Sequence, residues 1–172
     1  MAIDMVVQSL LRVELFSGLK PLQLAELARR SDRIVYKPGD AIITEGAAGD
    51  AAVLIVSGDA VRVAGPVHIE TVEPIVPGSL LGEMAMIIDT TYSSTVVARS
   101  LTRAIRITRE AVLEQIAADS SLASHLSTKL AHRLQVVSAQ LREIDDTFTL
   151  IDQAFVPAFA ATDMTQARPQ LH

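Results

Sequence analysis

The segment from Ile34 to Ile107 constrains the fold most, because it is a series of short apolar runs that each stop at turn-forming residues. Pro38-Gly39-Asp40, Ser57-Gly58-Asp59 and Gly65-Pro66 are three of these turns. Val and Ile dominate the runs, and β-branched residues between Gly-rich turns are typical of strands. Many short strands at regular spacing predict a β-sandwich or β-barrel.

The predicted strands are residues 34–36, 41–44, 51–56, 61–63, 67–72, 95–97 and 104–107, with a loop at 74–78. Strands of this length are not stable alone, so they need a shared apolar core. Aromatic residues make up only 3% of the chain and Trp is absent, so that core must consist mainly of Leu, Ile, Val and Ala.

Helices are predicted on both sides of the strands. Residues 3–30 form two helices separated near Gly18, and Pro21 occupies the first turn of the second. After the last strand, Thr108 caps a short helix and Asp119 begins the cap of a long one. Pro157 is expected to end that helix, which gives domains at 1–118, 119–156 and 157–172, the last a tail.

The predicted long helix carries apolar residues at alternating spacings of four and three. They are Leu130, Leu134, Val137, Leu141, Ile144, Phe148, Ile151 and Phe155. A helix that packs on its own domain usually shows a wider stripe, whereas a narrow seam of this kind indicates a partner helix. The sequence therefore predicts a homo-oligomer through residues 122–155. If Leu134 is an a position, then Leu141, Phe148 and Phe155 are also a, and Val137, Ile144 and Ile151 are d. Leu at a with Ile at d can favour oligomers larger than a dimer.

The composition argues against several other classes of function. The chain has no Cys, which removes disulfides, thiolate chemistry and Cys-type zinc sites. Its net charge of −5 argues against a nucleic-acid partner. No secretory signal and no apolar run of spanning length is seen, so a cytoplasmic protein without a membrane partner is expected.

No enzyme motif is recognisable. The chain has neither a nucleophile elbow nor a P-loop. A metalloenzyme of the cupin type is the remaining alternative, because His68 and Glu70 lie on a predicted strand. A cupin needs further His ligands from neighbouring strands, and the strand region has none, so no metal site is predicted.

The sequence Gly82-Glu83-Met84-Ala85, followed by Tyr92-Ser93-Ser94, resembles the phosphate-binding cassette of cyclic nucleotide-binding domains. The turns at 38–40, 45–46 and 57–58 agree with the turn pattern of that family. The resemblance covers residues 10–150 and implies a mainly β fold, a double-stranded β-helix (jelly roll) with flanking helices and a long C-terminal dimerisation helix. Because the rolls flank the helical seam in this family, the resemblance favours a dimer.

The resemblance also implies the roles of single residues. Glu83 would accept a hydrogen bond from the ribose 2′-hydroxyl, and exposed backbone N–H groups would meet the cyclic phosphate. Tyr92 stands where the family has an Arg that pairs with the phosphate, and a charge-assisted contact of that kind contributes about 1.5–3 kcal/mol. Its loss would weaken binding by about tenfold to a few hundredfold.

The cAMP receptor-like branch of the family places an adenine-contacting Thr and a Ser on the long helix. Here these positions are Val137, which cannot hydrogen-bond through its side chain, and Ser138, which is retained. The DNA-binding helix-turn-helix of that branch is not expected in this chain.

The sequence thus predicts a non-enzymatic, homodimeric sensor or regulatory module with a degenerate phosphate site. No cofactor is expected, and cAMP or cGMP would bind weakly. A sensor of a different anionic or nucleotide-like ligand, with Tyr92 stacking or donating, is the alternative. The sequence identifies no effector protein. The predicted ligand-binding residues are Gly82, Glu83, Met84, Ala85, Tyr92, Ser93, Ser94, Val137 and Ser138.

Overall fold

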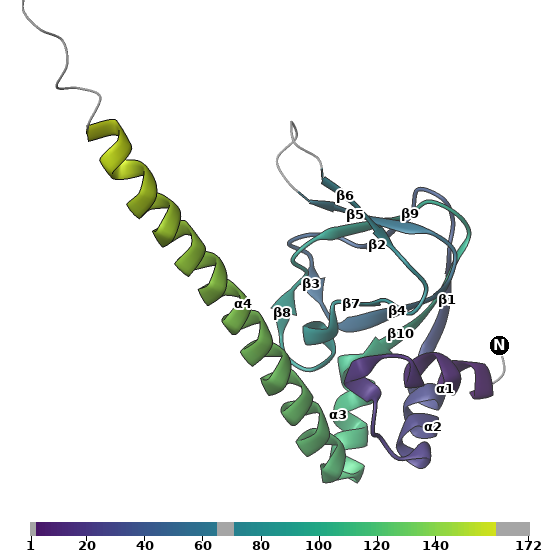
Figure 1. Cartoon of the computed structure of the whole chain (residues 1–172). Coiled ribbons are helices and arrows are strands. Elements are labelled where there is room, and N and C mark those ends of the chain that lie inside the picture. Colours follow the sequence, from purple (N-terminus) through teal and green to yellow (C-terminus); the bar gives the residue numbers. More distant parts are fainter. Residues whose placement is uncertain (1–2, 65–70, 161–172) are drawn as a thin grey trace, which may run out of the picture. The chain divides into compact units, whose positions relative to one another are not determined.

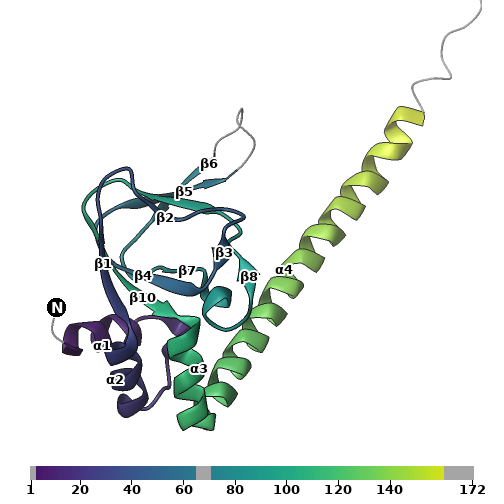
Figure 2. The same cartoon turned by 180° about the vertical axis from the view of Figure 1, so that it is seen from behind.

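The computed structural model describes residues 3–64 and 71–160 (Figures 1 and 2). The chain divides into two compact units, residues 1–127 and 128–172. The first unit holds the strands and most helices, and the second is the greater part of one long helix.

The first unit begins with helices α1 (Ile3–Leu11) and α2 (Pro21–Arg30), joined through the short 3₁₀ helix η1 (Glu14–Phe16). The two predicted N-terminal helices are therefore confirmed, and Pro21 is the first residue of α2, where a missing N–H group costs nothing.

Ten strands follow among the described residues, and two of the sheets that they form have four strands each. The strands are β1 (Asp32–Tyr36), β2 (Ala41–Ile43), β3 (Ala48–Gly49), β4 (Ala51–Ser57), β5 (Ala60–Ala64), β6 (Thr71–Ile75), β7 (Leu80–Leu81), β8 (Thr90–Thr91), β9 (Thr95–Ala98) and β10 (Thr102–Thr108). One sheet has the order β1-β10-β4-β7 and the other β2-β9-β5-β6, and β3 pairs with β8. All these pairs are antiparallel.

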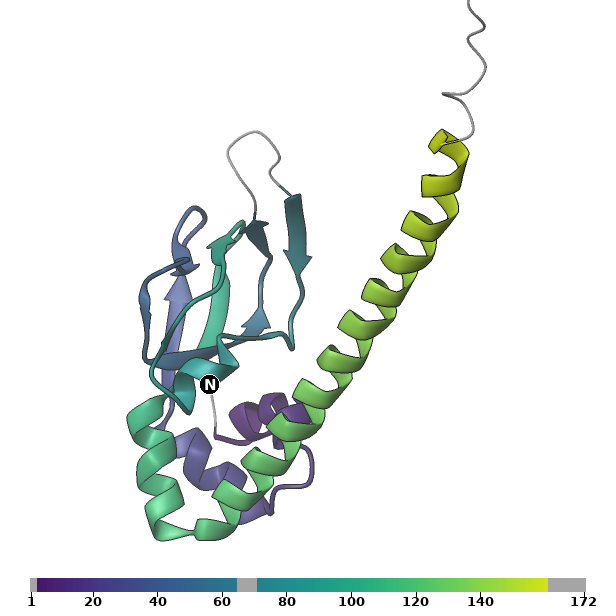
Figure 3. The same ribbon diagram turned by 90° about the vertical axis from the view of Figure 1, so that its left-hand side faces the viewer.

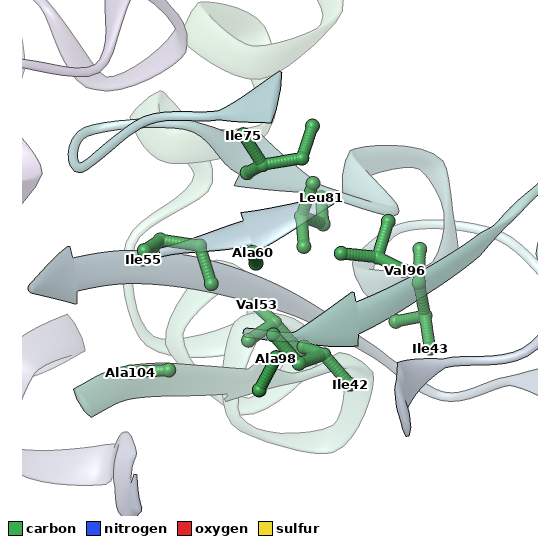
Figure 4. Packing of buried hydrophobic residues seen from close by; sticks show 10 residues of the cluster. All are labelled: Ile42, Ile43, Val53, Ile55, Ala60, Ile75, Leu81, Val96, Ala98 and Ala104. Carbon is green, nitrogen blue, oxygen red and sulfur yellow. The ribbon is translucent and has the colours of Figure 1, made fainter. Parts of the chain in front are cut away.

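The core of the roll lies between the two four-stranded sheets, where small and branched apolar side chains meet (Figure 4). The buried members are Ile42, Ile43, Val53, Ile55, Ala60, Ile75, Leu81, Val96, Ala98 and Ala104. They come from β2, β4, β5, β6, β7, β9 and β10, so both sheets contribute. The predicted mainly β roll with flanking helices is confirmed.

The central strand β4 is buried on both faces, which explains its continuous apolar run. Val53 and Ile55 belong to the core of the roll. Ala52 and Leu54 alternate with them and are also buried, on the side where α1 contacts β4 and α3 (Arg109–Ala118) contacts β10. Figure 3 shows these helices gathered at one end of the roll.

The helix caps follow the sequence. The Thr108 hydroxyl accepts a hydrogen bond from the Ala111 amide at 3.2 Å, which caps α3. The Asp119 carboxylate accepts from the Ser121 amide at 3.0 Å at the start of α4 (Ser120–Ala160). Hydrogen bonds from Ser121 and from Gln23 of α2 lower the pKa of Asp119, so the cap keeps its charge.

The strand predicted at 67–72 is only partly testable, because residues 65–70 lie outside the described part of the chain. The loop predicted from residue 74 is wrong at its start, since β6 extends through Pro74 to Ile75. Within the described ranges β6 is an edge strand that pairs with β5 alone, and there Pro74 lies opposite Val61. An edge position tolerates proline because its missing N–H group leaves no second neighbour unsatisfied.

The predicted end of the long helix at residue 156 is also wrong, because α4 continues to Ala160. Proline removes one backbone donor and crowds the preceding turn, but the residues that follow can still be helical. Two of the next three residues are Ala, the strongest helix former. Most of the predicted tail, residues 161–172, lies outside the described residues.

Candidate functional site

The segment from Gly82 to Ser94, which we call the cassette, begins with a short helix, as the resemblance implies. Gly82 has φ +64° and ψ 36°, and the 3₁₀ helix η2 (Glu83–Met86) follows it directly. The Ala85 amide donates to the Gly82 carbonyl oxygen at 3.0 Å. The left-handed conformation at Gly82 favours glycine, because a Cβ atom would be strained there.

The side chain of Tyr92 lies against this helix start. A Cβ atom placed on Gly82 would be only 2.6 Å from Tyr92 Cε1, and one on Gly49 would be 3.5 Å from the same atom. The Tyr92 hydroxyl donates to the carbonyl oxygen of Ala51 at 2.9 Å. The ring therefore occupies space that two glycines leave open, and the hydroxyl holds it there.

The backbone at position 92 is fixed from the other side by the turn before β3. The Tyr92 amide donates to the Ala47 carbonyl oxygen at 3.0 Å, and the Gly46 amide donates to the Tyr92 carbonyl oxygen at 2.9 Å. Strands β3 and β8 pair beside these bonds, with Gly49 opposite Thr90. Since the backbone is held, other side chains at position 92 start from the same place, close to Gly82.

The other predicted cassette residues differ in exposure. Ala85 is buried, and its Cβ would be 2.6 Å from a Cβ placed on Gly49, so it is a packing residue. Glu83 and Met84 are partly exposed. Ser93 is exposed, whereas Ser94 is buried. The structure therefore brings the two ends of the cassette together through Tyr92 and Gly82.

The two predicted residues of the long helix, Val137 and Ser138, lie in the second unit, and both are exposed there. The two units are not placed relative to each other. Whether these residues reach the cassette stays a prediction.

The arginines beside the cassette are already paired with carboxylates. Arg106 of β10 forms ion pairs with Asp50 and, at 3.4 Å, with Asp32. Burial lowers the pKa of Arg106, but its bonds and charge interactions with the two aspartates outweigh this and raise it. Arg109 pairs with Asp89 at 3.3 Å. A group with two carboxylate partners has little attraction left for a further anion.

A second tyrosine packs against the same core as Tyr92. Tyr36 of β1 is half-buried beside the roll cluster. Burial raises the pKa of Tyr36; the positive charge of Arg106 lowers it, and nearby Tyr92 and Asp40 raise it further. The net effect keeps this phenol neutral at pH 7, so it adds no charge to the site.

Gly49 and Ala51 are site residues that the sequence did not indicate. The sequence shows turn residues around Gly49, but its role is close packing and not a positive φ. The contact joins residues that are far apart in the chain. The one sequence signal for this packing is the bulky side chain of Tyr92, which requires space among the neighbouring short strands.

We expect Gly82→Ala to lower the free energy of unfolding by about 2–5 kcal/mol, from backbone strain and from the clash with Tyr92. Gly46→Ala is the matched control, because Gly46 also has a positive φ (+75°) but a Cβ there meets nothing within 4 Å. It should cost only about 1–2 kcal/mol. Urea denaturation measures both. If the two variants lose the same stability, the Tyr92 ring does not fill the space beside Gly82. In Gly82→Ala with Tyr92→Ala, the combined loss should be smaller than the sum.

Neither a metal centre nor a membrane span is found in the described part of the chain. Among those residues, no group of three or more His, Asp or Glu could hold a metal ion. His68 and Glu70, on which the cupin alternative depends, lie outside the described residues. None of the helices described has the length and apolar character needed to span a bilayer.

We compared the sequence and the fold with those of known proteins. Residues 33–119, which include the whole cassette, match the model of the family described as cyclic nucleotide-binding domain. A cAMP-dependent protein kinase regulatory subunit of Aspergillus fumigatus is 37% identical over 102 residues, which are 57% of this chain and 24% of that protein. The chain thus matches about a quarter of the length of such relatives.

Solved structures give the same result. A cyclic nucleotide-binding-like protein from Brucella abortus is 33% identical, with a TM-score of 0.60 over 65% of this chain and 97% of that one. The catabolite activator protein of Thermus thermophilus is 28% identical, with a TM-score of 0.64 over 76% of this chain and 62% of that one.

Proposed function

Because the chain belongs to the cyclic nucleotide-binding domain family, we propose that it is a non-enzymatic, homodimeric regulatory module whose phosphate site is degenerate. The family is the one that the sequence predicts. The single observation that carries the proposal is the packing and hydrogen bonding of the Tyr92 side chain. Its ring packs beside Gly82, and its hydroxyl is committed to the Ala51 carbonyl oxygen.

The electrostatic balance at the cassette supports weak binding of a cyclic phosphate. A phosphate at the start of η2 would meet backbone N–H groups, which contribute about 0.3–1 kcal/mol as a helix terminus. It would not meet the Arg–phosphate pair that the family carries at position 92, which is worth about 1.5–3 kcal/mol. The missing pair would therefore stabilise the phosphate more than the helix start does. Arg106 and Arg109 do not replace it, because each already has a carboxylate partner.

The long helix supports the homodimer. In the single chain Leu134 and Leu141 are each 61% exposed, and Val137, Ile144 and Phe148 on the same seam are exposed as well. Exposed apolar side chains at heptad spacing along a helix are stabilised when a second copy of the helix covers them. The side chains of Ile151 and Phe155 lie outside the described set.

In the alternative function, a sensor of a different anionic or nucleotide-like ligand, Tyr92 would stack on the ligand or donate a hydrogen bond to it. Its hydroxyl already donates to Ala51, and its ring already packs against the roll core. We therefore favour the degenerate module over a sensor that uses this side chain.

Calorimetric titration of the purified full chain with cAMP and with cGMP tests the proposal. We expect weak or undetectable binding of either nucleotide, about tenfold to a few hundredfold weaker than a site with the Arg–phosphate pair. A cooperative thermal transition in the same sample shows that the protein is folded. Dissociation constants in the micromolar range or tighter for the unmodified chain would contradict the degenerate site.

A further inference from the structure

We propose that the outer face of β1, at the free edge of its sheet, is a docking strip for an acidic, extended peptide. The strip consists of Arg33, Val35 and Lys37 of the β1 segment together with Leu101 and Arg103 at the start of β10. The peptide would add to the sheet as a further strand beside β1. This inference is independent of the phosphate site and of the helical seam.

The register of β1 and β10 places Arg33, Val35 and Arg103 on one face, while Lys37 directly follows β1 and Leu101 directly precedes β10. Val35 lies directly opposite Arg103, and Arg33 lies opposite Ile105. The neighbouring residues Ile34 and Tyr36 lie opposite Ala104 and Thr102. Because Ala104 belongs to the core of the roll, and side chains alternate along a strand, Arg33, Val35 and Arg103 face away from that core. Ile105 lies on the same face, opposite Arg33, and is buried.

The strip combines exposed apolar surface with unpaired positive charge. Val35 is 55% exposed and Leu101 is 52% exposed. Arg33, Lys37 and Arg103 are exposed, and none of them forms an ion pair within the described part of the chain.

Five of the seven other arginines of this unit have carboxylate partners, whereas Arg12 and Arg99 form no ion pair with the described residues. Arg29, Arg30, Arg62, Arg106 and Arg109 each form an ion pair. The carboxylates beside the strip form no ion pair with its cations. Asp32 pairs with Arg106, and Asp40 accepts a hydrogen bond from the Lys37 amide at 2.7 Å and keeps its negative charge. A protein of net charge −5 thus keeps three cations that form no ion pair among the described residues around an apolar centre.

The backbone of β1 supplies the second element of recognition. β1 is the terminal strand of the order β1-β10-β4-β7, and Figures 1 and 2 show it along the rim of the roll. Among the described residues no strand pairs with its other side. The N–H and C=O groups on that side can pair with an added strand. By contrast, the edge strand β6 carries Pro74, which lacks a donor.

These features select a peptide over other anionic partners. A lipid surface or a nucleic acid would satisfy the cations but not the backbone groups of an edge strand. Charges on an edge can also serve only to prevent aggregation. Such an edge needs no exposed apolar centre, whereas Val35, which is on β1 itself and 55% exposed, gives an added strand an apolar contact.

The probe is a labelled peptide of alternating Glu and Val, measured by fluorescence anisotropy with the purified full chain. We expect saturable binding that weakens as salt rises from about 0.05 to about 0.5 M. The double charge reversal Arg33→Glu with Arg103→Glu should weaken binding by about tenfold or more. The matched control is Arg12→Glu with Arg142→Glu, which changes the net charge equally at exposed positions outside the strip and should have little effect.

Two further probes separate strand addition from general attraction of anions. A peptide with N-methyl groups on alternate residues keeps its charge but cannot pair along the edge, so it should lose binding. Vesicles of anionic phospholipid and a random DNA duplex should not bind. The proposal is overturned if the peptide does not bind, if both double variants act alike, if the N-methylated peptide binds equally well, or if vesicles or DNA bind in place of the peptide.

Discussion

Replacing Leu134 and Leu141 together with Asp should convert the proposed homodimer into a monomer. Both residues occupy a positions of the seam, and each is 61% exposed in the single chain. Burying a Leu side chain against a partner contributes about 1.5–3 kcal/mol, and a dimer has two copies of each. An Asp at the same place would bring an unpaired charge into the seam, which opposes association further. Light scattering should show half the mass of the unmodified protein.

A neighbouring pair of valines provides a matched control. Val136 and Val137 are 43% and 45% exposed, so they differ little in size or exposure. Only Val137 belongs to the seam. Val137→Asp should weaken the dimer, whereas Val136→Asp should leave the mass unchanged. The seam hypothesis fails if the Leu134→Asp, Leu141→Asp variant keeps its mass and its fold, or if the two valine variants behave alike.

The sequence predicts those features of the fold that depend on neighbouring residues. The caps at Thr108 and Asp119 form because their side chains reach amides two or three residues away. The long strands β4 and β10 were predicted within a few residues of their observed bounds, because β4 has a continuous apolar run and β10 is rich in Ile and Thr. At these caps and strands the neighbouring residues alone are sufficient to predict the local structure.

The differences arise where distant parts of the chain decide the structure. Strands β3, β7 and β8 have two residues each and carry no periodic signal of their own. Pro74 joins β6 only because its strand is at an edge, which no local pattern reveals. The helix continues past Pro157 although the local rule predicts an end.

The sequence predicts which residues belong to the site, but it does not predict the contacts between them. The Gly-Glu pair and Tyr92 were both indicated by the sequence. Sequence spacing does not show that the Tyr92 ring lies between Gly82 and Gly49, or that its hydroxyl bonds to Ala51. These contacts depend on how β3, β4 and β8 come together, which is a property of the folded roll.

Tyr92→Arg should give the protein a gain in cAMP affinity of about tenfold to a few hundredfold. The backbone at position 92 is held by hydrogen bonds with Gly46 and Ala47, so the new side chain starts beside Gly82. A guanidinium there would lie near the start of η2 and could pair with a cyclic phosphate in a bidentate manner. The variant loses the hydroxyl bond to Ala51, which should lower its stability by about 0.5–1.5 kcal/mol.

Three further variants show whether the gain comes from charge. Tyr92→Gln removes the ring without adding a charge, so it should bind no better than the unmodified chain. In the Tyr92→Arg background, Glu83→Ala should abolish the gain, because Glu83 would hold the ribose hydroxyl. Val137→Thr in that background should add a smaller increment through the base. Calorimetric titration measures all of them. If Tyr92→Arg folds but gains nothing, the cassette is closed by more than one lost residue. If Tyr92→Gln gains as much, the ring blocked the pocket and the missing charge was not the cause.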